Sequence, residues 1–177
     1  MNGVRAAIIA VFVAGLGACT APNEGHQPEH FTADPAISML QALSSDELQG
    51  RGVGTEGSAQ ARRMITARLE SLGVGPLGDS FEYPFKYGPF RNPQTGEDAV
   101  PDKDGSNLIA QIAGSSDSEI SLVVTAHYDH LGVREGEIYN GTDDNASGVV
   151  AALSIAEHFA ENPPAHDVIL VFFDAEE

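Results

Sequence analysis

The sequence predicts an α/β fold in which a mixed, largely parallel sheet is sandwiched by helices. Apolar stretches at 107–112, 120–126 and 168–173 have the length and composition of buried strands. An amphipathic helical pattern at 145–160 separates the last two of them. Strand, helix and strand in succession are typical of a layered α/β domain, whose ligand sites form beyond the carboxyl ends of the strands. Polar clusters follow these strands directly, so the same pattern indicates where a site should lie.

Residues 1–18 have the pattern of an export signal. Arg5 gives a weakly positive start and 6–16 is an apolar run, which is shorter than the roughly 20 residues that cross a bilayer. The end of this segment and the following Cys19 (LGAC) resemble the bacterial lipobox, which implies lipid attachment at Cys19. An ordinary export signal followed by a buried thiol is the alternative. Thr20 after the cysteine implies an exported protein that is anchored to the outer membrane.

The next segment, 19–33, is polar and contains proline, without an apolar period. We expect it to be a flexible tether between the lipid anchor and the domain. His26 and His30 lie four residues apart in this segment, but no helix is expected to hold them, so we interpret them as solvated residues. Cys19 is the only cysteine of the chain, which excludes a disulfide within one copy.

A formal net charge of -17 over 177 residues argues against a nucleic acid partner, because so acidic a surface repels phosphate backbones. The same charge suits partners with a positive group, such as a peptide with a free α-amine. The chain is 42% hydrophobic, enough for one globular domain with a substantial core.

Two helices are predicted first, at 35–43 and 55–72, and Gly73 ends the second. The glycines between them read Gly52-x-Gly54-x-x-Gly57, which is the literal dinucleotide-binding pattern. That pattern requires a buried strand directly before it, and the polar residues 45–49 do not form one. The sequence therefore does not predict nucleotide binding.

Strands are predicted next, beginning with an alternating pattern at 79–87 and continuing with the two apolar stretches that follow. The segments 88–105 and 131–143 are expected to be loops. Pro163 and Pro164 end the helix at 145–160. The last strand is apolar on both sides, which is expected of an inner strand covered on both faces.

The first polar cluster contains His127 and Asp129. An imidazole nitrogen is a good ligand for zinc, and a carboxylate two residues further on can accept a hydrogen bond from the same ring. His130 can compete with Asp129 for that role. An ordinary hydrogen-bonded His–Asp pair is the alternative interpretation of this cluster.

The other two clusters supply carboxylates. Asp144 precedes a helix that Asn145 or Ser147 can cap, so it either interacts with the helix dipole or uses its two oxygens to bridge two cations. Glu176 and Glu177 directly follow a core strand, where one can bind metal while the other moves a proton. A solvated acidic tail is the alternative for this pair.

Taken together, residues 43–177 resemble the M28 family of zinc aminopeptidases, especially its exported bacterial members. The likeness rests on five ordered motifs: LQGRGVGTEG (48–57), GSNLIA (105–110), AHYDHLG (126–132), GTDDNASG (141–148) and FFDAEE (172–177). It implies two zinc ions, with His127 on one, Glu177 on the other and Asp144 bridging both. It further implies that Glu176 is the general base, and that the peptide bond between Asp144 and Asn145 is often cis.

The same resemblance implies two more ligands, an Asp and a His, downstream of Glu177. We therefore expect 34–177 to be the N-terminal part of a catalytic domain that is incomplete at its C-terminus, and inactive when it is expressed alone.

The function predicted from these motifs is hydrolysis of the N-terminal peptide bond of peptides. A glutaminyl-cyclase-like acyltransferase with a single zinc is one alternative, although such relatives carry DSAVP where this chain has DNASG (144–148). A non-catalytic, lipid-anchored binding protein is another. Zinc content and hydrolysis of an aminoacyl-nitroanilide would separate the three.

Overall fold

The computed structural model describes residues 33–88, 90–91, 94, 98–100 and 103–177. The predicted export signal, Cys19 and all but the last residue of the predicted tether lie outside this part of the chain. Ala33, which we assigned to the tether, is the first residue of helix α1 (Ala33–Leu43). None of the helices in the described ranges is long and apolar enough to cross a membrane.

The main sheet is mixed, as the sequence predicts. Its strands run in the order β1-β5-β9-β6, and β2 also pairs with β5. The expectation of a largely parallel sheet is wrong for the described strands, because only β6 and β9 are parallel among them. Strand β5 is antiparallel to each of its partners. The bounds are β1 Gly75–Pro76, β2 Glu82–Tyr87, β5 Lys103–Ile112, β6 Ser121–His127 and β9 Asp167–Phe173.

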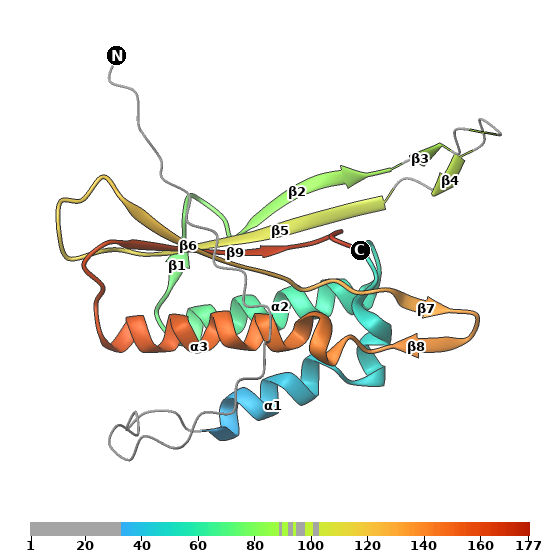
Figure 1. Cartoon of the computed structure of the whole chain (residues 1–177), viewed down its shortest axis with the longest axis horizontal. Helices are drawn as coiled ribbons and strands as arrows, with labels where there is room; N and C mark the ends of the chain where they lie inside the picture. The colour runs from blue at the N-terminus through green and yellow to red at the C-terminus, as the bar shows by residue number, and fades with distance from the viewer. Residues whose placement is uncertain (1–32, 89, 92–93, 95–97, 101–102) are drawn as a thin grey trace, which may run out of the picture.

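The three long helices lie on one face of this sheet (Figure 1). They are α1, α2 (Glu56–Ser71) and α3 (Ser147–Glu161), and the predicted helical patterns match them within a few residues. The side chains that face them from the sheet include Leu108, Leu170 and Phe172, which are fully buried. This layer of helix on sheet is the hydrophobic core of the described part.

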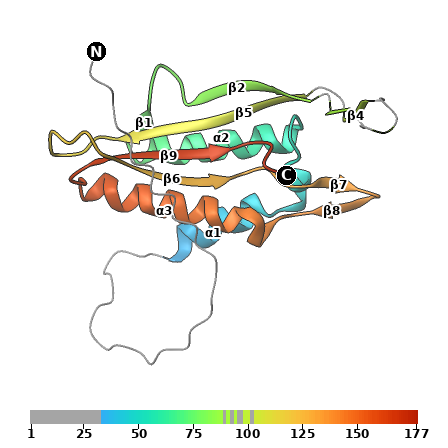
Figure 2. The same cartoon turned by 45° about the horizontal axis from the view of Figure 1, so that its top comes forward.

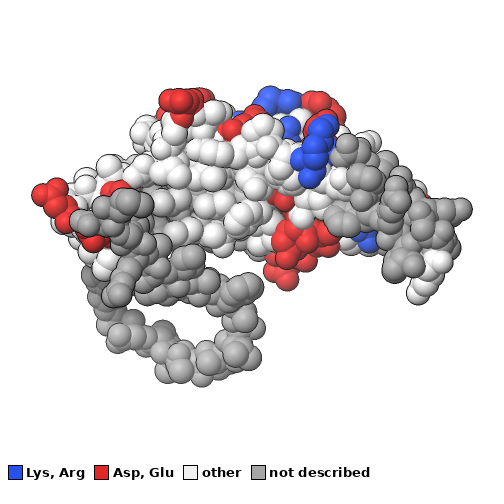
Figure 3. All heavy atoms as spheres, turned by 90° about the horizontal axis from the view of Figure 1, so that it is seen from above, with Lys and Arg blue, Asp and Glu red and all other residues white. Residues whose placement is uncertain are grey.

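Strand β9 is an inner strand, as predicted, because it lies between β5 and β6. Among the described residues, however, helices cover only one of its faces. Ile169 and Val171 point to the opposite face and are half-buried, and Phe173 is exposed. Seen from this side, a broad area of uncharged side chains lies beside a group of acidic and basic ones (Figure 3).

The segment 131–143, which we expected to be a loop, contains a small hairpin instead. Its strands are β7 (Gly132–Arg134) and β8 (Glu137–Tyr139). Glu135 and Gly136 both have positive φ and form the two-residue turn between them. Such turns usually carry Asn or Asp at the first position, so the glutamate conceals the signal in the sequence.

The predicted loop at 88–105 is also partly wrong. Two short strands, β3 (Phe90–Arg91) and β4 (Asp98–Val100), pair within it. Strand β5 begins at Lys103, inside the predicted loop, because Lys103, Asp104 and Gly105 extend its antiparallel pairing with β2.

A short 3-10 helix, η1 (Asp46–Arg51), connects α1 to α2. Glycines allow it to lie close to its neighbours. A Cβ on Gly50 would overlap the carbonyl oxygens of Tyr139 and Gly132, and one on Gly57 would overlap the carbonyl oxygen of Leu48. Gly57, the last glycine of the dinucleotide-like pattern, and Gly50, which precedes that pattern, therefore serve packing around η1. This packing directs Arg51 into the protein.

Candidate functional site

The candidate site forms where the parallel strands β6 and β9 end side by side. His127 is the last residue of β6 and pairs in register with Phe173, the last residue of β9. The segments after both strands therefore enter the same region. Figure 2 shows the C-terminus of the chain at this end, beside the β7–β8 hairpin. The prediction that the polar clusters meet beyond the strand ends is confirmed.

His127 contacts carboxylates from both of the other clusters. Its Nε2 lies 2.9 Å from Asp144 Oδ1 and 3.9 Å from Glu176 Oε2, and its side chain is 11% exposed. Burial lowers the pKa of the imidazole, but the hydrogen bond and charge of Asp129 and the charges of Glu176 and Asp144 outweigh it and raise the pKa to about 8. The carboxylates around this ring therefore favour a positive charge at this place. Either a proton on the ring or a bound cation can supply that charge.

Asp129 is buried and holds the backbone that carries the glutamate pair. Its carboxylate accepts hydrogen bonds from the Glu176 N–H at 3.1 and 3.2 Å and from the Glu177 N–H at 3.3 Å. The expected contact with His127 is longer, at 3.6 Å between Nδ1 and Oδ1, and the same Nδ1 lies 3.3 Å from the Asp129 carbonyl oxygen. Asp129 thus positions the segment after β9 as well as facing the ring.

Asp144 reaches the site from η2 (Thr142–Ala146), a short helical segment directly before helix α3. The peptide bond between Asp144 and Asn145 is cis, as the family resemblance implies. Asn145 caps the helix, since its Oδ1 accepts a hydrogen bond from the Gly148 N–H at 3.0 Å. Ser147, the other candidate cap, donates instead to the Asp143 carbonyl oxygen. The Asp144 side chain is 64% exposed, so its second oxygen is available to a ligand.

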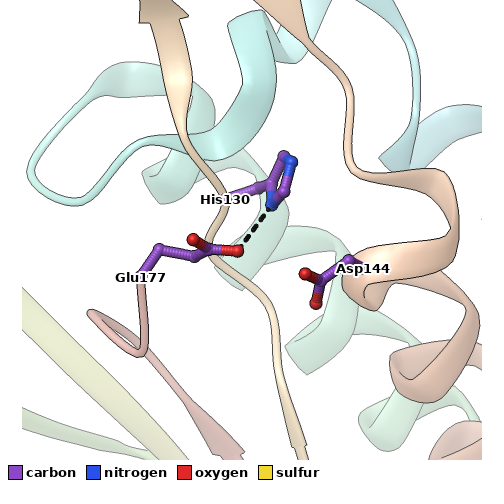
Figure 4. A group of neighbouring side chains, drawn as sticks. All are labelled: His130, Asp144 and Glu177. Atoms are coloured by element: carbon purple, nitrogen blue, oxygen red, sulfur yellow. Dashed lines mark hydrogen bonds and ion pairs between the residues drawn. The ribbon is translucent and has the colours of Figure 1, made fainter.

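Glu177 pairs with His130, a residue that the sequence suggested only as a competitor of Asp129. His130 Nδ1 lies 3.1 Å from Glu177 Oε1. One ligand atom from each of His130, Asp144 and Glu177 lies within 4.8 Å of the others. Figure 4 shows the three side chains converging from the segment after β6, the segment before α3 and the end of the chain.

Arg51 holds the surrounding loops together, and sequence reasoning did not identify it. It is 1% exposed. Its guanidinium donates to four carbonyl oxygens, those of Leu43, Tyr128, Asn140 and Gly141. Burial lowers its pKa, while the charges of Asp129 and Asp144 act in the opposite direction. The one signal in the sequence is an arginine between two glycines, which does not reveal burial.

Asp174 anchors the other side of the segment after β9. Its Oδ2 accepts a hydrogen bond from the Ser106 N–H at 3.1 Å and lies 3.7 Å from Arg62 Nη1. Its backbone N–H donates to Asn107 Oδ1 at 3.0 Å. Burial raises the pKa of Asp174. Asp174 and Asp129 therefore fix the backbone immediately before and at the two glutamates.

The side chains gathered here are suitable zinc ligands. Imidazole nitrogens and carboxylate oxygens are the donors that zinc takes in catalytic sites, and two histidines and three carboxylates converge on this region. A carboxylate between two imidazoles is also the arrangement expected of a residue that bridges two ions. The residues present thus fit the metal that the sequence predicts.

Solved structures of zinc exopeptidases and related enzymes share this fold. A glutaminyl cyclase from Fimbriiglobus ruber aligns with a TM-score of 0.64 and 22% identity, over 90% of this chain and 50% of its own. A Zn-dependent exopeptidase from Parabacteroides distasonis aligns with a TM-score of 0.61 and 20% identity, over 82% and 47%. The described part of the chain therefore has a zinc exopeptidase-like α/β fold.

Residues 107–177 match the family model of peptidase family M28. Curated relatives include a vacuolar membrane protease of Schizosaccharomyces japonicus, 31% identical over 74 residues, and a "Probable zinc metalloprotease" of Pyricularia oryzae, 33% identical over 78 residues. These alignments cover 42% and 41% of this chain but only 8% and 15% of the relatives.

Proposed function

We propose that the protein is a zinc-dependent aminopeptidase that hydrolyses the N-terminal peptide bond of peptides. The observation that carries the proposal is the meeting of His127, Asp144 and the glutamate pair at the ends of two parallel strands. In this proposal His127 and Asp144 hold one zinc ion, and Asp144 and Glu177 hold the other. Zinc supplies Lewis acidity, which polarises a carbonyl group and makes water a stronger nucleophile at neutral pH.

Glu176 is the proposed general base. Its side chain is 59% exposed, and its Oε2 lies 3.9 Å from His127 Nε2. The carboxylate therefore faces the site but does not form a close ion pair with His127. It takes a proton from the attacking water and returns it to the nitrogen of the leaving amine. Asp129 assists by fixing the Glu176 backbone N–H, which limits the positions that the carboxylate can reach.

The substrate class follows from charge. Asp144 and Glu176 both present exposed carboxylates at the site, and the chain as a whole is strongly acidic. A peptide with a free N-terminus carries a protonated α-amine, which these carboxylates attract. We propose peptides with free N-termini as the substrates.

The protein is proposed to be exported and lipid-anchored through Cys19. Its support is the lipobox-like sequence before that residue. The name of the Schizosaccharomyces japonicus relative, vacuolar membrane protease, also refers to a membrane. Two or more acyl chains on one cysteine would be enough for stable membrane attachment.

Glutaminyl cyclisation is the second candidate, because a solved glutaminyl cyclase shares the fold. The sequence around the helix cap argues against it. The DSAVP pattern of those relatives places proline at the position of Gly148, and the Gly148 N–H here donates to Asn145 Oδ1. Proline has no N–H to donate, so a chain with DSAVP could not form the hydrogen bond that caps helix α3 here.

Two substitutions test the proposal in the protein at its full natural length. Glu176→Gln should retain zinc while hydrolysis of an aminoacyl-nitroanilide falls by at least about 10²-fold, the low end for loss of a general base. Glu177→Gln should lose both hydrolysis and bound zinc. Glu161→Gln, at the exposed end of helix α3, is the matched control and should change neither zinc content nor turnover.

Zinc loss from Glu176→Gln together with zinc retention by Glu177→Gln would reverse the two roles. An unmutated protein that binds no zinc, or that cyclises glutaminyl peptides without hydrolysing the nitroanilide, would refute the proposed function.

A further inference from the structure

His130 is part of the candidate site, although no role has been assigned to it. It lies beyond β6, and its side chain is 11% exposed. The ring nitrogen Nδ1 faces Glu177, and the ligand atoms of His130, Asp144 and Glu177 form a group in which every pair lies within 4.8 Å (Figure 4). This group is separate from the His127–Asp144 pair but shares Asp144 with it.

We propose that His130 is a protein ligand of the second zinc ion, together with Asp144 and Glu177, and binds it through Nδ1. The inference rests on the proposed function and adds a residue to it. It gives the ion on the Glu177 side one nitrogen and two carboxylate ligands from this chain, which is the three protein ligands of a catalytic zinc site, all of donor types that zinc accepts. The ion on the His127 side keeps one nitrogen and the shared carboxylate.

The position of the His130 ring is fixed by its surroundings. A Cβ on Gly141 would come within 2.5 Å of the ring atom Cγ and 2.6 Å of Cδ2, so the ring lies directly against the glycine backbone. Any larger residue at 141 would displace the imidazole. Gly141 also has positive φ, at 56°, which favours glycine there.

Arg51 fixes both sides of this contact. Its backbone carbonyl oxygen accepts a hydrogen bond from the His130 N–H at 3.4 Å. Its guanidinium donates to the Gly141 carbonyl oxygen at 2.9 Å. The backbone that carries the imidazole and the glycine that supports it are thus attached to one buried residue, which is the kind of support that a precise ligand position requires.

The alternative role for His130 is to orient Glu177 by a hydrogen bond alone. The two roles need opposite tautomers. A hydrogen bond to Glu177 requires a proton on Nδ1, whereas a metal ligand needs the free lone pair of Nδ1 and carries its proton on Nε2. Substitutions can therefore separate them: a side chain that keeps an N–H donor preserves the first role, and one that keeps a metal-binding atom preserves the second.

The test measures metal content and affinity in the protein at its full natural length. His130→Gln retains an amide N–H donor but is a poor zinc ligand. His130→Cys offers a thiolate, whose zinc bond of about 2.3 Å is longer than the roughly 2.0–2.1 Å bond of a histidine nitrogen, so it can replace the nearby Nδ1. His166→Gln, at an exposed position just before β9, is the matched control.

We expect the unmutated protein and His166→Gln to bind two zinc ions. His130→Gln should bind the second ion more than about 100-fold less tightly, a greater loss than removing an outer hydrogen-bond partner causes. His130→Cys should retain both ions. After replacement with Co²⁺ it should show an absorption band from thiolate-to-metal charge transfer that the unmutated protein lacks.

His130→Gln with two ions bound at unchanged affinity, or His130→Cys without the charge-transfer band, would overturn the inference. If the unmutated protein binds two ions in that experiment, the proposed function survives this failure. If the unmutated protein binds no zinc at all, both the inference and the proposed function are refuted.

Discussion

Replacing the buried Arg51 by methionine should destabilise the protein strongly. Methionine preserves much of the apolar stem, but it removes every donor of the guanidinium. Four backbone carbonyl oxygens from three different segments then lose a charged partner. Because Arg51 is 1% exposed, water cannot replace these bonds without opening the structure.

The size of the effect follows from the number of bonds. A buried group that loses its partner costs about 1–3 kcal/mol, and the low end applies here because each carbonyl oxygen has a second lone pair. Four such groups give about 4 kcal/mol. Relief from burying a guanidinium opposes this loss, so we expect a net destabilisation of about 3–4 kcal/mol. That is a large share of the roughly 5–15 kcal/mol that stabilises most proteins.

Urea unfolding followed by circular dichroism measures this loss. With a slope of about 2 kcal/mol per M, typical of small proteins, the midpoint should fall by about 1.5–2 M. Arg63→Met is the control, since Arg63 forms an exposed ion pair with Glu56, and such pairs contribute about 0–1 kcal/mol. If Arg51→Met lowers the free energy of unfolding by no more than the Arg63 variant does, the role assigned to Arg51 is wrong.

Two further predictions concern packing and location. Gly57→Ala should cost about 1–3 kcal/mol or more, because its Cβ would overlap the Leu48 carbonyl oxygen, while Gly75→Ala, which meets no atom within 4 Å, should be nearly neutral; equal melting temperatures for the two variants would contradict this reasoning. Cys19→Ser should release the protein from membranes in a fractionation experiment. Unchanged membrane association, with no lipid label on the unmutated protein, would exclude the proposed anchor.

The elements with a strong apolar period were predictable from the sequence. The strands at 120–126 and 168–173 and the helix between them match β6, β9 and α3 closely. The β7–β8 hairpin was not predictable, since its turn uses a glutamate at positive φ. The uncovered face of β9 was not predictable either, because a strand that is apolar on both sides does not reveal which face is covered.

The residues of the candidate site were predictable as a set because carboxylates directly after buried strands are costly without a partner. The contacts among these residues were less predictable. Asp129 was expected to face His127, yet it also accepts the backbone N–H groups of Glu176 and Glu177, a contact that depends on how β6 and β9 align. Arg51 lies 77 residues from Tyr128 in the chain, and no local pattern indicates such a contact.

The partners of Arg51 also bear on the order of events during folding. They lie 8, 77, 89 and 90 residues away along the chain, so three of its four bonds form only after very long loops have closed. Contacts of this kind form slowly, because the entropy of loop closure must be overcome first. Since the same arginine supports Gly141 and the backbone of His130, the ligand group should mature late, after the strands and helices have already paired. A chain that is still being synthesised should therefore bind zinc only weakly until its fold is nearly complete.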